Sequence, residues 1–302
     1  MQDKIHYTAC LCCGSTSISR SFSAIDYTVS KEYFEVWKCS ICTFQFTQNV
    51  PDASHIGPYY QSADYVSHSD TKTGLTNGLY HFARRLTVKS KRNLVKAVTA
   101  LQQGSLLDFG AGTGAFASFM TQSGWQVTAL EPDNTARANA LKNHNLQLQD
   151  ADSLQQLQSS SFDAITLWHV LEHVHNLHAT LEHFERVLKP TGKLFIAVPN
   201  YTSYDAQHYQ DYWAAYDVPR HLYHFSPKAM EILLNKKGFS LEKIYPMWFD
   251  SFYVSLLSEQ YKYGSSRYFS AFAVGLLSNL KALFNTRKCS SVIYVVRKSI
   301  SN

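Results

Sequence analysis

The sequence contains no uninterrupted apolar run long enough to cross a membrane. A transmembrane helix needs roughly 18–20 consecutive apolar residues, and the nearest approach, Tyr268–Phe284, is interrupted by Ser278, Asn279 and Lys281. The N-terminus also lacks the basic, apolar and small-residue regions of a secretory signal. We therefore expect no transmembrane segment and a cytoplasmic location.

Charge is sparse, and the basic residues form no block. Charged residues make up 17% of the 302 residues, the net charge is +5, and lysines and arginines are scattered along the chain. Nucleic-acid binding needs a concentrated basic surface, so we expect no nucleic-acid partner. The apolar content of 45% allows a sizeable core in one large domain, or in a medium domain with a small appendage.

Cysteine is scarce beyond residue 42, but five of the six cysteines lie before residue 43. Cys10 and Cys13 form one Cys-x-x-Cys pair, and Cys39 and Cys42 form a second after 25 intervening residues. Two such turns present four thiolates to one tetrahedral ion, and a cytoplasmic setting disfavours disulfides. We predict a structural zinc at these four cysteines. Two alternatives remain. Cys12 could take the place of one of these ligands, or the cysteines could be reduced thiols packed in a small hairpin without a metal.

The middle of the chain alternates between strand and helix patterns. Such alternation predicts an α/β fold with a doubly wound, mostly parallel sheet. The predicted strands are 104–109, 126–130, 146–149, 162–167, 193–198, 240–245 and 291–297. The predicted helices between them are 114–123, 134–143, 177–188 and 227–237.

We expect three parts in this chain. Residues 1–50 form a zinc-ribbon-like segment, 51–103 form a linker with little regular structure up to 72 followed by one or two N-terminal helices, and 104–302 form the main domain. An aromatic stretch at 200–225 forms either a lid over a ligand or a satellite core. Residues 247–288 form a helical insertion, and the apolar face of its second helix is expected to pack as core, the alternative being a helix that seeks a lipid interface.

The glycine-rich turn at 107–114 is the most informative stretch. Alternating glycines let the backbone turn sharply between a strand and a helix, and let a ligand lie against it. Gly110, Gly112 and Ala115, with Glu131 about 20 residues on, also fit a dinucleotide pattern and hence a nicotinamide-dependent enzyme. Asp108 favours a cationic ligand over a pyrophosphate, and the carboxylate of Glu131 can accept two hydrogen bonds from a ribose diol.

An ordered set of motifs then resembles the class I S-adenosylmethionine-dependent methyltransferases. The set is similar to the branch with quinone and sugar methyltransferases, some of which carry an N-terminal cysteine ribbon, and it covers about residues 58–245. The resemblance implies a seven-stranded sheet whose last strand is antiparallel and lies between strands five and six. The motifs are LDFGAGTG at 107–114, LEPD at 130–133, DAD at 150–152, SFDAI at 161–165, WHVLEHV at 168–174, LKPTGKL at 188–194 and VPN at 198–200.

The resemblance also implies which residues hold the cofactor. The glycine turn would lie against its aminoacyl and sulfonium part, with a carboxylate near the ammonium group and another at the ribose. Three aromatic rings could close over the sulfonium by cation–π attraction. The residues implied are Gly110, Ala111, Gly112 and Gly114 for the turn, Asp108 for the ammonium group, Glu131 for the ribose, Asp150 and Ala151 for the adenine edge, Trp168 and His169 for the methyl group, and Tyr59, Tyr60 and Tyr65 for the aromatic cover.

The activity implied is methyl transfer by direct in-line displacement to a small-molecule acceptor: a sugar, a quinone or phenol, or a lipid-linked hydroxyl. A base is needed only if the acceptor loses a proton, and His169 and His221 are our candidates, ahead of His173 and His175. Glu172, His173 and His175 form an alternative divalent-metal cluster. A cofactor-binding zinc-ribbon regulator or adaptor is a second alternative function. The sequence predicts neither the acceptor nor the oligomeric state.

Overall fold

The computed structural model describes residues 4–61 and 75–299, with the backbone alone for 75–86. The chain folds into two compact units. The first comprises Met1–Asp64, His169–Leu177 and Ile196–Val295, and the second comprises Tyr65–Trp168, His178–Phe195 and Val296–Asn302. The domain ranges predicted from the sequence stay predictions.

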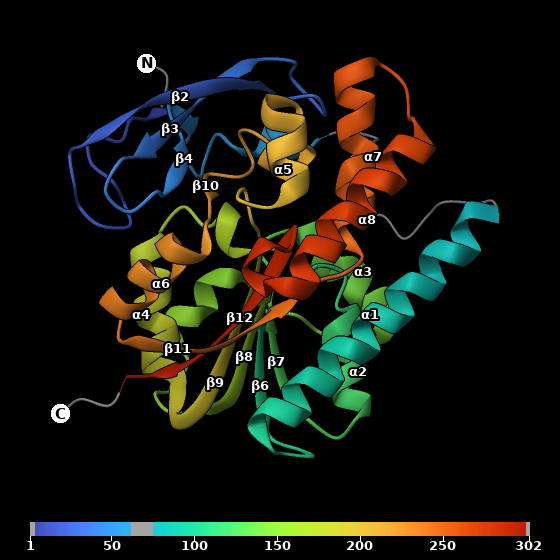
Figure 1. Cartoon of the computed structure of the whole chain (residues 1–302). Helices are drawn as coiled ribbons and strands as arrows, with labels where there is room; N and C mark the ends of the chain where they lie inside the picture. The colour runs from blue at the N-terminus through green and yellow to red at the C-terminus, as the bar shows by residue number, and fades with distance from the viewer. Residues whose placement is uncertain (1–3, 62–74, 300–302) are drawn as a thin grey trace. The chain divides into compact units, whose positions relative to one another are not determined.

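The first unit contains a small antiparallel sheet at the N-terminus (Figure 1). Phe34 and Val36 on β3 (Tyr33–Cys39) are buried while Tyr33 is exposed, the alternation of a strand with one face on a core. The segments 19–22 and 33–38, between the two cysteine pairs, both lie in strands of this sheet. The sheet has the order β10-β4-β3-β2, built from β2 (Ile18–Ile25), β3 (Tyr33–Cys39), β4 (Gln45–Thr47) and β10 (Tyr223–His224).

The chain between the second cysteine pair and the predicted linker forms regular structure. Residues 45–47 form β4, and β5 (Val50–Pro51) pairs with β1 (Lys4–Ile5). A short 3₁₀ helix, η1, follows at Gly57–Tyr60. β4 pairs with the distant β10, where Phe46 faces Tyr223 and Gln45 faces His224, so its regularity depends on a tertiary contact that no local pattern reveals. Residues 62–72 of the predicted linker lie outside the described residues.

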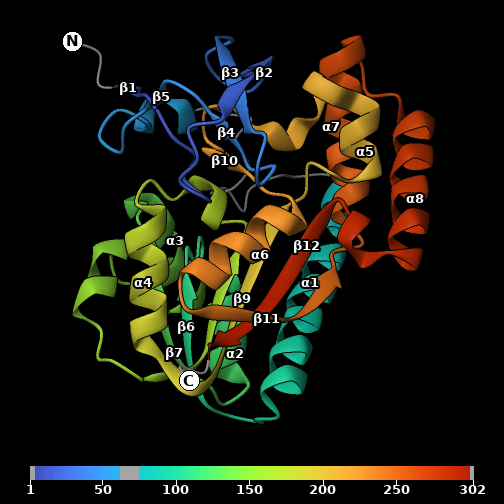
Figure 2. The ribbon, with the colours of Figure 1, turned by 60° about the vertical axis from the view of Figure 1, so that its left-hand side comes forward.

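The main sheet has six strands among the described residues, in the order β11-β12-β9-β8-β6-β7. β6 pairs in parallel with both β7 and β8, which confirms the α/β fold with a mostly parallel sheet. The last strand lies between the fifth and sixth predicted strands, as the resemblance implied, and Figure 2 shows β11 and β12 running in opposite directions. The strands are β6 (Ser105–Phe109), β7 (Gln126–Leu130), β8 (Phe162–Trp168), β9 (Leu188–Pro199), β11 (Phe239–Pro246) and β12 (Ser291–Lys298).

The seven-strand count needs a correction at 146–149. This predicted strand is reduced to one parallel bridge between Leu130 and Gln149. The Gln149 N–H donates to the Ala129 carbonyl, and the Gln149 carbonyl accepts from Glu131 N–H. Asp150 then caps the 3₁₀ helix η3 (Ala151–Gln156), so the chain turns away before a longer ladder can form.

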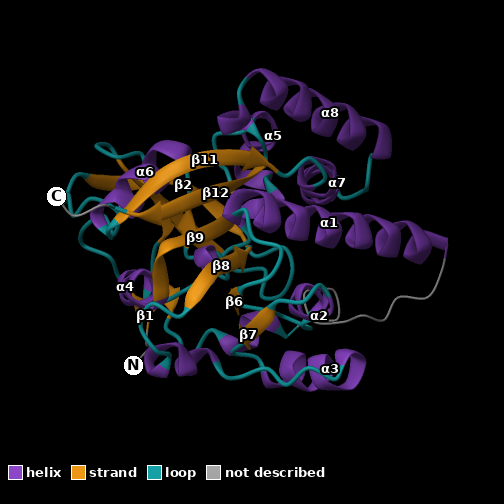
Figure 3. Ribbon diagram, turned by 90° about the horizontal axis from the view of Figure 1, so that it is seen from below, coloured by secondary structure: helices purple, strands orange, loops and turns teal. Residues whose placement is uncertain are grey.

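Helices cover both faces of the second unit's strands (Figure 3). α1 and α2 lie on one face of β6 and β8, and α4 lies on the other. The predicted N-terminal helical region is one continuous helix, α1. The helices are α1 (Leu75–Thr99), α2 (Ala115–Gln122), α3 (Asn134–His144) and α4 (Leu177–Val187), with α6 (Pro227–Lys236) in the first unit.

The aromatic stretch at 200–225 packs as core in the first unit. Tyr209 and Trp213 are buried in a cluster with Phe34 and Val36 of the small sheet. This packing fits the satellite-core alternative. The stretch contains α5 (Tyr204–Tyr209) and two 3₁₀ turns, η5 (Gln210–Tyr212) and η6 (Ala214–Tyr216).

Two helices, α7 (Asp250–Tyr263) and α8 (Tyr268–Phe284), form the predicted helical insertion and lie beside α5 (Figure 2). They pack closely, because a Cβ on Gly275 would lie 2.7 Å from the Phe252 side chain. Only small residues of α8 are buried, whereas Phe269 is 95% exposed and Phe284 is 93% exposed. The expectation that the apolar face of α8 packs as core is therefore wrong for its large residues. No helix in the described ranges is long and apolar enough to span a membrane.

Candidate functional site

The glycine turn after β6 has a backbone that only glycine adopts easily. Gly110, Gly112 and Gly114 have φ values of 72°, 55° and 75°, in the left-handed region that side chains disfavour. The N–H groups of Gly110 and Ala111 both donate to the Leu130 carbonyl, at 2.8 and 3.0 Å. The turn is thereby tied to the carboxyl end of β7.

The glycines differ in what surrounds them. A Cβ on Gly114 would lie 3.0 Å from the Cβ of Ala140, whereas a Cβ on Gly112 would meet nothing within 4 Å. Gly114 therefore allows the start of α2 to pack on α3. Gly112 borders open space, as a residue that lies against a ligand should.

The side chain of Glu131 joins the glycine turn to the segment that follows β7. Its Oε2 accepts from Gly112 N–H at 2.7 Å, and its Oε1 accepts from Asp133 N–H at 3.0 Å. The side chain is buried. Each carboxylate oxygen has two lone pairs, so these backbone contacts are compatible with the predicted hydrogen bonds to a diol.

Asp108 lies inside the sheet rather than on its rim. Its carboxyl accepts from Thr166 Oγ1 at 2.7 Å. Burial raises the pKa of Asp108 to about 7, although Thr166 and the charge of Lys91 oppose the rise. Whether Asp108 is charged near neutral pH therefore depends on the cations around it, which suits a partner of an ammonium group.

Lys91 is a residue that sequence reasoning missed. Its Nζ lies 4.5 Å from the centroid of the Trp168 ring, and Trp168 also packs edge-on against Phe116 at 5.4 Å. The indole Nε1 of Trp168 is buried, and no hydrogen-bond partner for it occurs among the described residues. A buried N–H without an acceptor is unusual and is available to a ligand. In the sequence, Lys91 is one of several cations on an amphipathic helix, so no local signal marks it.

The remaining predicted cofactor residues have local partners of their own. Asp150 accepts from Asp152 N–H at 3.0 Å at the start of η3, where Ala151 is the first residue, and pairs with Arg137 at 2.9 Å. In the first unit, the Tyr59 hydroxyl donates to Glu32 at 3.2 Å. Tyr65 lies outside the described residues.

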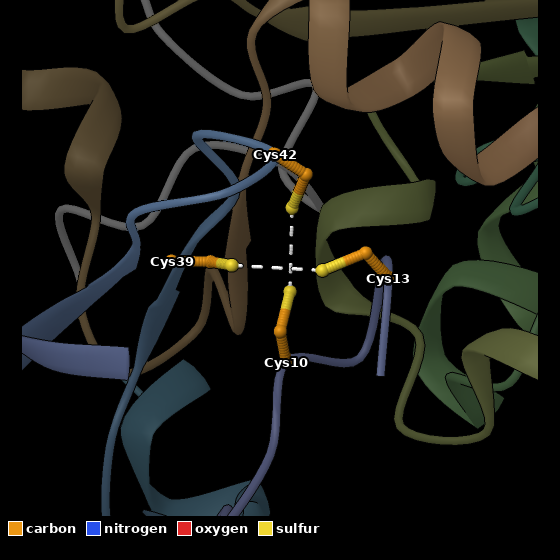
Figure 4. A group of neighbouring side chains, drawn as sticks. All are labelled: Cys10, Cys13, Cys39 and Cys42. Atoms are coloured by element: carbon orange, nitrogen blue, oxygen red, sulfur yellow. Dashed lines mark hydrogen bonds between the residues drawn. The ribbon is translucent and has the colours of Figure 1, made fainter. Parts of the chain in front are cut away.

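The four cysteines of the two pairs converge on one point (Figure 4). Cys10 Sγ lies 3.4 Å from Cys42 Sγ, and Cys13 Sγ lies 3.6 Å from Cys39 Sγ. All four sulfurs are within 4.8 Å of one another. The predicted cysteines are thus together, as the donor set for a tetrahedral zinc requires.

The two cysteine turns share one backbone design. In the first, Gly14 N–H donates to the Cys10 carbonyl at 2.7 Å; in the second, Thr43 N–H donates to the Cys39 carbonyl at 3.1 Å. Gly14 and Thr43 both have positive φ, at 81° and 67°. Thr43 adopts this conformation although its branched side chain disfavours it, so the surrounding structure imposes the shape of the second turn.

Cys12 does not join this group. Its Sγ donates to the Ala229 carbonyl at 3.2 Å. Burial raises its pKa to about 12, which keeps it a thiol. The geometry therefore separates Cys12 from the four converging sulfurs.

His169 is held between two carboxylates. Its Nε2 lies 3.0 Å from Asp250 Oδ2, and its Nδ1 lies 3.5 Å from Glu172 Oε1. Burial lowers the pKa of His169, but the two carboxylates outweigh it and raise the value to about 9. His169 is therefore protonated near neutral pH and is a poor general base. Asp250 lies 81 positions further along the chain, which is why sequence reasoning missed it.

Glu172, His173 and His221 form a second compact group, with one ligand atom of each within 4.8 Å of the others. The imidazole rings of His173 and His221 pack edge-on at 4.6 Å. Glu172 is fully buried, and neither carboxylate oxygen has a hydrogen-bond partner in the described part of the chain. His175 instead contacts the Pro51 carbonyl through Nε2 at 3.1 Å. The third member of the group is therefore His221 and not the predicted His175.

The backbone fixes the tautomers of both rings. His221 Nδ1 lies 2.8 Å from the Ala215 carbonyl, and His173 Nδ1 lies 3.0 Å from the Arg220 carbonyl. A carbonyl only accepts, so each Nδ1 carries a proton, and in the neutral ring the lone pair lies on Nε2. The Tyr60 hydroxyl also lies 3.1 Å from His173 Nδ1, where its oxygen can share that proton. Thr47 of β4 holds the backbone at residues 221–222. Its N–H donates to the Leu222 carbonyl at 2.9 Å, and its hydroxyl donates to the His221 carbonyl at 2.7 Å.

The comparisons with known proteins agree with this fold. Ubiquinone biosynthesis O-methyltransferase of Xanthomonas oryzae pv. oryzae is 36% identical over 115 residues, which are 36% of this chain and 48% of that protein. The Xanthomonas campestris protein of the same name is 35% identical over 115 residues, 36% of this chain and 48% of its own length. The chain thus spans about half the length of the curated relatives it matches.

Solved structures show the same fold. Magnesium protoporphyrin IX methyltransferase from Synechocystis, with S-adenosylhomocysteine bound, has a TM-score of 0.53 at 15% identity, over 82% of this chain and 100% of that one. Phosphoethanolamine N-methyltransferase 2 of Haemonchus contortus has a TM-score of 0.51 at 15% identity, over 85% of this chain and 63% of that one. A family profile described as a methyltransferase domain matches residues 81–244, more than half of the sequence. This chain therefore belongs to the methyltransferase-domain family and has the class I α/β fold.

Proposed function

We propose that this chain transfers a methyl group from S-adenosylmethionine to a hydroxyl of a small aromatic acceptor of the quinone or phenol class. The observation that carries the proposal is the glycine turn, whose Gly112 N–H is hydrogen-bonded to Glu131, in a chain that belongs to the methyltransferase-domain family. The names of the Xanthomonas relatives support O-methylation of a quinone precursor. Sugars and lipid-linked hydroxyls are the other acceptors to test.

The cofactor side of the reaction belongs to the second unit. S-adenosylmethionine supplies an electrophilic methyl group when bound. Glu131 would hold the ribose diol, and the open space beside Gly112 suits the aminoacyl and sulfonium part. Asp108 would act on the ammonium group through its charge, and the Trp168 Nε1–H would donate to the ligand. Asp150 and Ala151 would meet the adenine edge.

The acceptor hydroxyl loses its proton as its oxygen takes the methyl group, so a group must receive that proton. We infer that His221 rather than His169 takes part in this step. The neutral ring of His221 has its lone pair on Nε2, because Nδ1 donates to the Ala215 carbonyl, whereas His169 is already protonated between Asp250 and Glu172. The positive charge of His169 would instead stabilise the negative charge of the Glu172 carboxylate.

We also infer a structural zinc at Cys10, Cys13, Cys39 and Cys42. Four thiolates complete a tetrahedral site, which leaves no open position for chemistry. The matched backbone turns and the 3.4–3.6 Å sulfur separations support this donor set. Metal analysis of the purified chain should give one zinc per chain; protein without bound zinc that folds normally would contradict this inference.

The test of the function is calorimetric titration of the purified chain with S-adenosylmethionine, S-adenosylhomocysteine and NAD. Binding of the adenosyl pair alone supports the proposal, and methylation of phenolic, sugar and lipid-linked hydroxyls can then be compared. Binding of NAD alone would favour a nicotinamide-dependent enzyme. Binding of the adenosyl pair without transfer to any acceptor would favour the regulator.

A further inference from the structure

The group formed by Glu172, His173 and His221 has features that a folded core alone does not explain. Glu172 is fully buried, and both of its oxygens lack hydrogen bonds to the described residues. An unsatisfied buried carboxylate is costly, and buried charges are normally paired or coordinate a metal. Its ion-pair contact, His169 Nδ1 at 3.5 Å, faces only Oε1.

The two histidines are oriented as metal ligands are. In known sites, a ligating histidine usually donates its second ring N–H to a carbonyl or carboxylate, which fixes the ring and raises its basicity. Here the carbonyls of Ala215 and Arg220 receive the Nδ1 protons of His221 and His173. No hydrogen bond of the described residues uses Nε2 of either ring, and Asp217 Oδ2 is 3.9 Å from Nε2 of His221.

We propose that Glu172, His173 and His221 bind one divalent first-row transition-metal ion. Two imidazole nitrogens and one carboxylate favour such an ion over Mg²⁺ or Ca²⁺, which prefer oxygen ligands. Three protein ligands leave open coordination positions, unlike the four cysteines. The ion is therefore a second, chemically distinct metal centre in the first unit.

The role of this ion rests on the proposed function. A hydroxyl oxygen of the acceptor occupies an open position on the ion, which lowers the pKa of that hydroxyl. The proton leaves to solvent, and the resulting oxygen carries the electron pair that forms the new bond to the methyl carbon, whose bond to sulfur breaks. With the ion bound, the Nε2 lone pair of His221 coordinates the ion, so His221 promotes deprotonation as a ligand and does not itself receive the proton.

Cobalt titration tests the site without depending on activity. Protein with its cysteine site already filled by zinc is titrated with Co²⁺, and both the visible spectrum and the thermal unfolding midpoint are recorded. We expect one further equivalent to bind, without the intense sulfur-to-cobalt absorption of a thiolate site, and the unfolding midpoint to rise with cobalt concentration. No second equivalent, or a thiolate-type spectrum only, would overturn the proposal.

Three variants assign the ligands. Glu172→Gln and His221→Gln keep the size of the side chains and should weaken cobalt binding by at least about tenfold. His175→Gln is the matched control, because His175 is a neighbouring histidine that contacts the Pro51 carbonyl, and it should bind cobalt like the wild type. Zinc content and circular dichroism confirm that each variant is folded. Wild-type affinity in both Glu172→Gln and His221→Gln would show that Glu172 only balances His169 and would overturn the site.

Failure of this proposal and failure of the proposed function look different. Methyl transfer by protein that holds zinc but binds no cobalt would overturn the second metal centre and leave the methyltransferase intact. Cobalt binding at the predicted residues without transfer to any hydroxyl acceptor would support the centre and contradict the function.

Discussion

The carboxylate of Glu131 accepts a hydrogen bond from the backbone N–H of Gly112 at 2.7 Å, across 19 residues of sequence. The residue proposed to bind the ribose therefore also fixes the turn that would hold the rest of the cofactor. Loss of the carboxylate should affect both functions at once.

Replacement of Glu131 tests this double role. Glu131→Ala should weaken S-adenosylhomocysteine binding by about 1–3 kcal/mol, the usual cost of losing a charged hydrogen-bond partner. Glu131→Gln keeps one acceptor oxygen and should lose less. Calorimetry measures both affinities. Equal affinity in the wild type and Glu131→Ala would exclude the ribose role.

The two glycines of the turn should respond differently to alanine. Gly114→Ala meets both a left-handed backbone and the Ala140 side chain at 3.0 Å, so it should lower the free energy of unfolding by more than the ~1–2 kcal/mol of the backbone alone. Gly112→Ala meets only the backbone cost but fills the open space, so it should reduce cofactor binding more than stability. Urea unfolding and calorimetry separate the two effects. The reverse order would contradict the assignment of open space to the ligand.

Zinc should depend on the four converging cysteines and not on Cys12. Cys39→Ser should release zinc and make the N-terminal segment sensitive to protease. Cys12→Ser, in the same stretch, keeps a donor for the Ala229 carbonyl and should retain zinc. Metal analysis after gel filtration gives the comparison. Zinc loss from Cys12→Ser with retention in Cys39→Ser would exclude this ligand set.

His169 should make stability depend on pH. Its pKa of about 9 in the folded chain lies above the usual histidine value of 6.5, so its contribution to stability is fully present below about pH 6.5 and is lost as the pH rises through about 9. Burial lowers the pKa of His173 to about 4, so His173 does not titrate in this window.

The matched variant for this effect is His169→Asn. His169 has φ 59°, and asparagine is among the residues that tolerate the left-handed region best. The difference in unfolding free energy between wild type and His169→Asn should shrink between about pH 6.5 and pH 9. A difference that stays constant over this range would show that the carboxylates do not hold the imidazolium.

The exposed face of α8 should contribute little to folding. Phe269→Ser with Phe284→Ser should leave the unfolding midpoint nearly unchanged, because both rings are already in contact with solvent. The double variant should elute earlier from a hydrophobic-interaction column. Gly275→Ala is the contrasting change and should destabilise, since its methyl group would strike Phe252. A destabilised serine variant would mean that the rings are covered in solution.

Local signals explain how much of this could be predicted. The glycine turn and the cysteine pairs are set by spacings of two to four residues, and the strand–helix alternation of the sheet is set by periodicity, so the sequence alone predicts them. The prediction of a strand at 146–149 is wrong because the hydrophobic pattern of the residues does not show where backbone pairing with the neighbouring strand stops. The aromatic stretch at 200–225 has the composition of either a lid or a core, and only its partners decide between them.

The contacts within the histidine cluster could not be predicted from the sequence. His173 and His221 are 48 positions apart and Asp250 is 81 positions from His169, so their contacts depend on the tertiary fold. The protonation of His169 follows from two carboxylates that the sequence does not place together. Lys91 looks like an ordinary surface cation of a helix until its neighbours Trp168 and Asp108 are known.

The contact of Thr47 with residues 221–222 has a consequence for the position of His221. A chain shortened to begin after β5 would remove both Thr47 hydrogen bonds and the partner strand of β10, and would leave the carbonyls of His221 and Leu222 without their donors. The cysteine-rich beginning of the chain is thus part of the scaffold that sets the direction of His221. Its loss would disturb the position of a residue that lies more than 170 positions away in the sequence.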